Sequence, residues 1–282
     1  MDNKRKVVRM LASTAVTDGD GVSINRSITG GSLVDTDPFL LLDEIRSDDP
    51  RCYIGGFPEH PHRGFETVTY MLKGAMKHSD HLGNEGVLNE GDVQWMTAGR
   101  GVLHAEMPLQ KNGLLHGFQL WINLAANEKM QPANYREYPA TTIPEVSLAS
   151  QGHARVIAGT FTYQGTSTHG PVTGVSVDPE YVDIALNRHH SFTLTTHSKK
   201  RLLLYVYQGS MNIESTQLNT QTLGILSMGD SVTIQANEDC RFLWLAGLPL
   251  NQPIAQWGPF VMNTQQEIRQ AIADYRQGKL VI

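Results

Sequence analysis

Two short pairs of polar residues have the types and the spacing to bind a metal ion. His60 and His62 flank Pro61, and His104 and Glu106 form a second pair further along the chain. In an extended strand, residues i and i+2 project from the same face, so each pair can direct two donor atoms at one ion. Pro61 favours this geometry because it restricts the preceding residue to extended backbone. Three imidazole nitrogens and one carboxylate oxygen would suit one divalent transition metal per chain and leave positions open for substrate and O₂.

Several residues near these pairs are expected to shape the site. We expect Glu66 to form a hydrogen bond to one of the metal-binding residues, because Glu106 already supplies a carboxylate. The alternatives are that Glu66 itself binds the metal or that it is a charge at a strand edge. The turn Arg63–Phe65 and the loop Gly99–Leu103 are expected to line the entrance. Gln119 alternates with apolar neighbours in a strand-like run, so it lies either in the cavity or in the core.

Other residues that could bind metals or react have simpler interpretations. His78 and His81 are expected on a solvated hairpin edge, with a second metal site as the alternative. Cys52 and Cys240 are expected to be small buried side chains rather than a disulfide or a redox pair. With no other thiol in the chain, a cysteine-rich structural zinc site is disfavoured.

The segments that must position these side chains are short and rich in β-formers. They lie between glycine-containing turns and include Thr67–Leu72, Asp92–Met96 and Phe118–Ile122. This spacing is typical of barrels and sandwiches rather than of a parallel α/β sheet. Two stretches have a helical pattern, Pro38–Arg46 and Thr264–Gln277, and the second begins with a capping box. We therefore expect an all-β protein with a C-terminal helix that straps its outside.

An internal repeat indicates that the chain arose by duplication. Val68–Met76 resembles Leu203–Met211, and Leu88–Asp92 resembles Leu226–Asp230 in the same order. A repeat of this length indicates two tandem domains rather than a solenoid.

The second copy is not expected to bind metal. At the corresponding offsets it has Thr195 and His197 in place of the first metal-binding pair, and Phe242 and Trp244 in place of the second. These residues could not rebuild the donor set, so the sequence predicts a single metal site, in the first copy.

Length and composition agree with a two-domain protein. The chain has 282 residues, of which 40% are hydrophobic, and a net charge of −5. We expect a domain over residues 1–131, a linker with three prolines over 132–150, and a second domain over 151–282. The charge excludes a global basic field for nucleic acid or anionic membranes. The longest apolar run, Leu202–Tyr207, is far shorter than the roughly 20 residues of a membrane helix. We expect a soluble, cytoplasmic monomer.

Two long motifs resemble the pirin family of two-cupin proteins. They are His60–Tyr70 and Gly91–Pro108, and the shorter segments Gln119–Asn123 and Gly258–Asn263 are similar to the same family. The resemblance implies two tandem cupin domains, which are jelly-roll-like β-barrels, with a metal only in the N-terminal one. By position, the family's four ligands fall on residues 60, 62, 104 and 106. The usual cupin carboxylate falls on Glu66, which pirins do not use as a ligand.

The resemblance also implies a function. Pirins are similar to quercetin 2,3-dioxygenases, which open the heterocyclic ring of a flavonol with O₂ and release carbon monoxide. The expected metal is iron(II), with Mn, Ni, Co, Cu or Zn as alternatives in isolated protein, and Glu106 is the expected base. The substrate would be a small aromatic or enolic compound. The alternative is a metal-dependent, redox-responsive regulator that binds a transcription factor or an enzyme, and a third interpretation is a cupin isomerase.

Overall fold

The computed structural model describes residues 3–282, which divide into two compact units. The N-terminal unit contains Thr14–Leu33, Phe39–Ala140 and Leu250–Ile282. The C-terminal unit contains the residues up to Ser13 together with Val34–Pro38 and Thr141–Pro249. All paired strands within their sheets are antiparallel, which agrees with the predicted all-β class.

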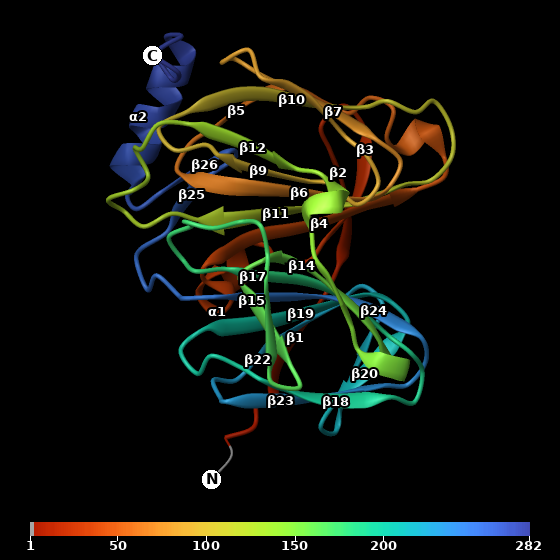
Figure 1. Ribbon diagram of the computed structural model, residues 1–282. Coiled ribbons are helices and arrows are strands. Elements are labelled where there is room, and N and C mark those ends of the chain that lie inside the picture. Colours follow the sequence, from red (N-terminus) through yellow and green to blue (C-terminus); the bar gives the residue numbers. More distant parts are fainter. Residues whose placement is uncertain (1–2) are drawn as a thin grey trace. The chain divides into compact units, whose positions relative to one another are not determined.

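The N-terminal unit is built from two sheets (Figure 1). The larger sheet has seven strands in the order β12 (Asn134–Tyr138), β9 (Val93–Thr97), β6 (Phe65–Lys73), β11 (Leu115–Asn123), β4 (Phe39–Ser47), β3 (Val22–Arg26) and β2 (Thr14–Asp18). The smaller sheet has the order β5 (Phe57–His62), β10 (Val102–Pro108), β7 (Met76–Asp80) and β8 (Glu85–Leu88). The hairpin β25 (Ala255–Trp257) and β26 (Phe260–Met262) and the helix α2 (Gln265–Arg276) complete the unit.

The C-terminal unit has the same two-sheet design. Its larger sheet has the order β1 (Val7–Ala12), β22 (Thr222–Leu226), β19 (Arg201–Gln208), β24 (Cys240–Gly247), β17 (Glu180–Leu186), β14 (Gly152–Ala158) and β13 (Glu145–Ser147). Its smaller sheet has the order β18 (Ser191–Thr195), β23 (Ser231–Ala236), β20 (Ser210–Ile213) and β21 (Thr216–Asn219), and β15 (Thr160–Tyr163) pairs with β16 (Thr166–His169). One-turn helices connect the strands of the chain: η1 (Gly30–Ser32), α1 (Leu33–Thr36), η2 (Pro50–Cys52), η3 (Ala140–Thr142) and η4 (Ala149–Gln151).

The strand order of the two units repeats. The order β9–β6–β11–β4 in one unit corresponds to β22–β19–β24–β17 in the other, and β5–β10–β7–β8 corresponds to β18–β23–β20–β21. The first matched segment is therefore equivalent in both copies, since Val68–Met76 and Leu203–Met211 lie on β6 and β19 with the strand that follows each. The second match is wrong, because Gly91 precedes β9 whereas Gly229 precedes β23, the counterpart of β10. Strands and turns differ in length between the two copies. A constant difference in residue number therefore does not identify equivalent residues along the whole repeat.

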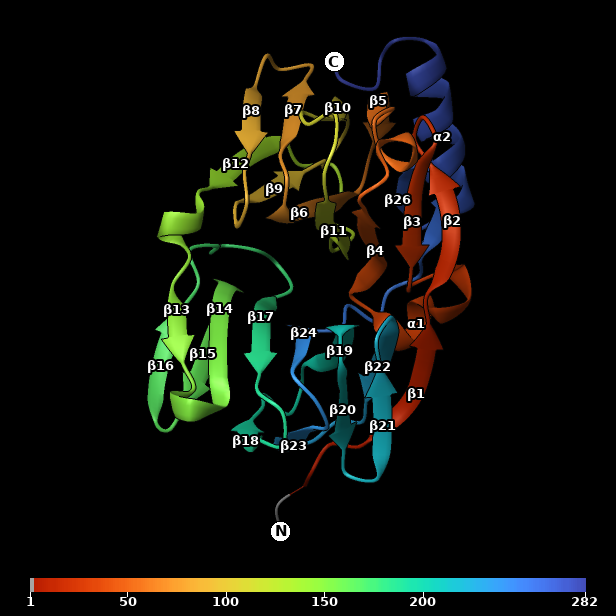
Figure 2. The same ribbon diagram turned by 90° about the vertical axis from the view of Figure 1, so that its right-hand side faces the viewer.

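The ends of the chain lie in units other than those predicted. The prediction gave 1–131 to one domain and 151–282 to the other, but β1 pairs with β22 of the C-terminal unit, as Figure 2 shows. Residues Leu250–Ile282, including α2, belong to the N-terminal unit. The predicted linker, 132–150, is not a free connection, because β12 pairs with β9 and β13 pairs with β14. A strand at the edge of a sheet has unpaired backbone groups, and β1, β12 and β13 each pair with the strand that would otherwise be exposed in this way.

One of the two predicted helices is confirmed and one is wrong. Helix α2 has Thr264 as its N-cap, with the capping box to Glu267, and Gln277 as its C-cap. By contrast, Phe39–Ser47 is β4, which pairs with β3 and β11 and has seven consecutive buried residues. A strand buried on both faces has no period-2 alternation, so its apolar run was mistaken for a helical pattern. Within the part of the chain that the structure describes, no helix is both long and apolar enough to cross a membrane.

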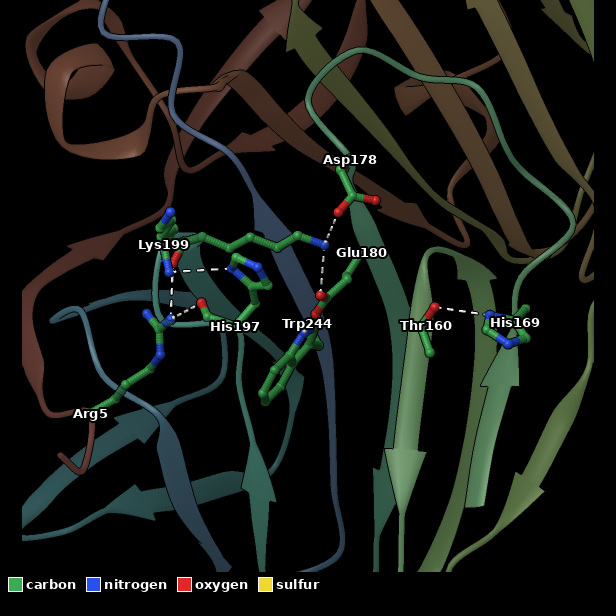
Figure 3. A network of polar contacts seen from close by, with 9 residues as sticks. Arg5, Thr160, His169, Asp178, Glu180, His197, Lys199 and Trp244 are labelled. Carbon is green, nitrogen blue, oxygen red and sulfur yellow. Dashed lines mark hydrogen bonds and ion pairs between the residues drawn. The ribbon is translucent and has the colours of Figure 1, made fainter. Parts of the chain in front are cut away.

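A polar network anchors the start of the chain in the C-terminal unit (Figure 3). Arg5 is fully buried, and its guanidinium donates to the backbone oxygens of His197 at 2.8 Å and Lys200 at 2.9 Å. The Lys200 ammonium in turn lies 2.9 Å from Glu180, whose other oxygen accepts from Trp244 Nε1 at 3.0 Å. These contacts satisfy the buried cations and fix the segment that leads into β1.

Candidate metal centre

Both predicted pairs lie on adjacent strands of the smaller sheet in the N-terminal unit. His60 and His62 end β5, and His104 and Glu106 lie on its neighbour β10, where His104 is directly opposite His60. The imidazole centroids are 4.4 Å apart for His60 and His104, 4.7 Å for His60 and His62, and 4.9 Å for His62 and His104. One nitrogen from each of these three residues, the histidine cluster, lies within 4.8 Å of the others.

The cluster contains nitrogens that lack a hydrogen-bond partner. His62 and His104 are buried, and neither His62 Nδ1 nor either nitrogen of His104 has a partner among the described residues. A buried polar atom left unsatisfied costs roughly 1–3 kcal/mol. Burial, reinforced by the neighbouring imidazoles, holds the pKa of His62 and of His104 well below the usual value, which keeps both rings neutral. Neutral imidazoles with free lone pairs are the form that binds a metal, so the residues fit a divalent transition metal.

Glu106 is held in place by two neighbouring strands of the larger sheet. Its side chain is buried, and its Oε1 accepts a hydrogen bond from Thr69 Oγ1 on β6 at 2.8 Å. Its Oε2 accepts from Gln119 Nε2 on β11 at 3.0 Å. Burial raises the pKa of Glu106, while these two hydrogen bonds and the nearby His60 oppose the rise. Gln119 thus lies beside the predicted base, and Thr69, which sequence reasoning missed, is directly opposite Gln119 in the sheet register.

The expected place of His78 on a solvated edge is wrong. His78 is 0% exposed and lies directly opposite Glu106 on β7. With His104 and Glu106 it forms a second group whose donor atoms lie within 4.8 Å of one another. Gln94 Nε2 lies 3.0 Å from His78 Nδ1, and burial lowers the pKa of His78 to about 4. Among the described residues His78 Nε2 has no hydrogen-bond partner, and it lies 3.9 Å from Asp80 Oδ2. Alternate residues of β7 face inward, so the period-2 pattern of Met76–Asp80 could have indicated that His78 is buried, but not which strand it faces. His81 is a half-buried residue at the following turn.

Two of the other predicted residues, Glu66 and Phe65, do not line the cavity. Glu66 accepts a hydrogen bond from Thr97 Oγ1 at 2.7 Å and contacts no member of the histidine cluster through a hydrogen bond. It is three positions from Thr69 on β6, so it projects from the opposite face of the sheet. Phe65 is fully buried, and its ring centroid lies 5.1 Å from that of His62 and 4.3 Å from that of Trp121. Phe65 therefore packs against the His62 ring without lining the cavity.

Arg63 also lies outside the cavity, because it binds the C-terminal segment. Its Nη1 lies 2.7 Å from Asp274 Oδ2 on α2, its Nη2 donates to the Leu280 backbone oxygen at 3.2 Å, and its Nε donates to the Arg100 backbone oxygen. The cation is buried, and each of its three nitrogens has a partner. Arg63 therefore joins the turn after His62 to the C-terminal helix of the same unit.

Replacing Arg63 with alanine is expected to lower the free energy of unfolding by about 3 kcal/mol, because it leaves the partners of a buried cation unpaired. Chemical denaturation of the purified protein measures the change. Arg100→Ala is the matched control, since the Arg100 side chain is exposed and only its backbone oxygen contacts Arg63. Equal stability of the two variants would show that Arg63 contributes nothing to the attachment of α2.

A cavity of about 910 Å³ opens onto the histidine cluster within the N-terminal unit. Its polar end contains His60, His62, Thr69, Glu106 and Gln119, and the Trp121 ring lies beside them. The rest of its wall is largely apolar and includes Ile24, Leu33, Leu41, Ile45, Phe57, Met71, Met76, Leu115, Phe118 and Ile254. The cavity is large enough for a bicyclic aromatic compound.

The entrance is not where the sequence placed it. Neither the turn Arg63–Phe65 nor the loop Gly99–Leu103 lines the cavity. The C-terminal segment packs against both: a Cβ at Gly64 would lie 2.0 Å from the Val261 oxygen, and one at Gly101 would lie 2.2 Å from the Leu280 oxygen. The exposed lining residues are instead on the β2–β3 turn, at the start of β5, at the tip of the β25–β26 hairpin, and at Gly30 and Gln265, which begin η1 and α2.

The equivalent positions of the C-terminal unit contain apolar residues. In the pairing of β18 with β23, Leu194 faces Val232 and Phe192 faces Ile234, all of them buried in the core. Ile213 faces Ile234 in the same way as His78 faces Glu106. The predicted replacements were misassigned: Thr195 is exposed and His197 follows the strand, while Phe242 and Trp244 lie on β24, the counterpart of β11. Both groups of potential metal ligands in the described residues belong to the N-terminal unit.

Comparison with known proteins agrees with this architecture along the whole chain. The family model described as Pirin matches residues 21–122, and the one described as the Pirin C-terminal cupin domain matches residues 181–281. A curated protein of Pseudomonas aeruginosa, provisionally named a quercetin 2,3-dioxygenase, is 43% identical, with all of both chains covered. Human Pirin is 38% identical, with 99% of this chain and 95% of the human protein covered.

A solved structure is similar to this chain over almost its whole length. The crystal structure of a quercetin 2,3-dioxygenase from Acinetobacter baumannii has a TM-score of 0.91 and 36% identity, with 99% of this chain and all of that chain covered. The two family matches cover most of both cupin domains, and the similarity to the solved structure extends over 99% of the chain. The chain therefore belongs to the pirin family of two-cupin proteins.

Proposed function

We propose that this protein is a metal-dependent dioxygenase that opens the heterocyclic ring of a flavonol such as quercetin with O₂. The observation that carries the proposal is the cluster of three imidazoles beside a hydrogen-bonded carboxylate at the polar end of a large apolar cavity. The names of the Pseudomonas and Acinetobacter relatives support the same reaction class.

Four residues would hold the ion, namely His60, His62, His104 and Glu106. Three nitrogens and one oxygen without a thiolate suit iron(II), with Mn, Ni, Co, Cu or Zn as alternatives in isolated protein. When bound, the ion supplies Lewis acidity and redox chemistry with O₂. The four residues leave open positions on a six-coordinate ion, which both substrates require.

The carboxylate of Glu106 would accept the proton of the flavonol 3-hydroxyl. The hydrogen bonds from Thr69 and Gln119 fix both of its oxygens, so its orientation is set before the substrate arrives. The apolar wall of the cavity would bind the flat rings and exclude water from the reacting centre. In the reaction, both oxygen atoms of O₂ enter the ring-opened ester, and one ring carbon leaves as carbon monoxide.

Iron-loaded protein is expected to convert quercetin in air with release of one carbon monoxide per flavonol consumed. Loss of the flavonol absorbance and headspace carbon monoxide measure this, and protein stripped of metal is the control. The same assay is repeated with Mn, Ni, Co and Cu. No turnover with any of these metals would contradict the dioxygenase and favour the regulatory alternative, which a pull-down that responds to the iron oxidation state would test directly.

A further inference from the structure

Trp257 is an exposed tryptophan at the edge of the cavity. Its side chain is 67% exposed, whereas Trp95 and Trp244 are each 3% exposed. It lies at the end of β25 and lines the cavity together with the next two residues of the hairpin tip. A large aromatic side chain that is exposed at the edge of a cavity is free to stack on the flat ring of a ligand in that cavity.

The hairpin that presents Trp257 is bonded to the turn that follows β5, the strand with His60 and His62. The Arg63 backbone N–H donates to the Pro259 oxygen at 3.3 Å, and the Val261 N–H donates to the Arg63 oxygen at 3.0 Å. The buried Lys129 ammonium donates to the Val261 oxygen at 3.1 Å and to the Gly64 oxygen at 2.7 Å. The hairpin is thus fixed beside the turn that follows His62, so Trp257 is held in place before a ligand binds.

Two further ring side chains line the same cavity. Phe57 and Pro58 begin β5, a few residues before His60, and both line the cavity. Arg26 pairs with two carboxylates of the lining, since it lies 2.7 Å from Asp43 and 2.8 Å from Asp18. The rim therefore offers apolar ring surface rather than an unpaired charge, which suits a flat, uncharged group.

We propose that Phe57, Pro58 and Trp257 form an aryl subsite that binds the ring of the substrate farthest from the metal-binding end. The ligand class is a 3-hydroxy-4-pyranone head with an aryl substituent, in which the head reaches the histidine cluster and the aryl group stacks on Trp257. The assignment of the head group rests on the proposed function. The aryl subsite does not require O₂ chemistry, so it can be tested separately.

Calorimetry on zinc-loaded protein separates the two ends of the ligand. Three probes are compared: 3-hydroxyflavone with both parts, maltol with the pyranone head alone, and flavone, which lacks the hydroxyl. Trp257→Ala is expected to weaken 3-hydroxyflavone and flavone about tenfold, the size of a lost aromatic contact, and to leave the affinity for maltol unchanged. Trp257→Phe is expected to keep most of the affinity. Leu82→Ala is the control, because it removes an exposed apolar side chain of the same unit outside the cavity.

Each outcome distinguishes the subsite from the proposed function. An equal loss for maltol and 3-hydroxyflavone, or no loss for either aryl ligand, would overturn the aryl subsite. So would a wild-type protein that binds 3-hydroxyflavone no more tightly than maltol. A selective loss of the aryl ligands in a protein that converts no flavonol with any metal would uphold the aryl subsite and contradict the dioxygenase.

Discussion

Replacing His104 with alanine is expected to abolish metal binding and flavonol turnover together. His104 is central, since it belongs both to the histidine cluster and to the group with His78 and Glu106. Loss of a residue that only supports a ligand typically lowers metal affinity 10- to 100-fold, so loss of a ligand itself should cost at least about 100-fold. Metal content after dialysis, measured by mass spectrometry, and carbon monoxide release are the two readouts.

The fold should survive this change, which separates a metal effect from unfolding. The His104 side chain makes no hydrogen bond through either nitrogen among the described residues, so its removal breaks none. His81→Ala is the matched control, because His81 lies on a nearby turn outside both groups. If His104→Ala kept a full equivalent of metal, the assignment of His104 as a ligand would be wrong.

Glu106→Gln is expected to reduce kcat at least about 100-fold, the lower range for removal of a general base. Metal should be retained, because the histidine cluster remains and the amide keeps an oxygen donor. The steady-state rate with quercetin and the metal content of the same sample measure the two effects. This split between rate and metal content distinguishes Glu106→Gln from the alanine variant of His104.

Glu66→Gln is the matched control for Glu106→Gln. Glu66 is also a buried carboxylate of the N-terminal unit, but its hydrogen bond goes to Thr97 and it projects from the other face of β6. The kcat of the Glu66→Gln variant should match that of the wild type. If Glu106→Gln turned over quercetin at the wild-type rate, Glu106 could not be the base.

The sequence alone was sufficient for the parts of the site that depend on local spacing. The H-x-H and H-x-E pairs required only that both segments be extended, and β5 and β10 are adjacent antiparallel strands. Helix α2 was predictable because capping is a local interaction between Thr264 and Glu267.

Features that depend on strand pairing were not predictable from spacing. His78 reaches the site because β7 pairs with β10, and nothing in its immediate sequence identifies that partner. The place of Arg63 depends on Asp274, more than two hundred residues away, and the rim position of Trp257 depends on the hairpin packing beside β5 and β6. The domain boundaries failed for the same reason, since the unit to which β1 and α2 belong is set by pairing and packing rather than by sequence order.

The distribution of the chain between the two units has a consequence for synthesis. The wall of the cavity and the contacts of Arg63 require Leu250–Ile282, which are synthesised after Thr141–Pro249 of the C-terminal unit. The N-terminal unit, although most of it is translated earlier, must therefore wait with its cavity wall incomplete until the strands of the other unit have been made. A nascent chain released before residue 250 would yield no finished N-terminal unit, so it could not complete the cavity.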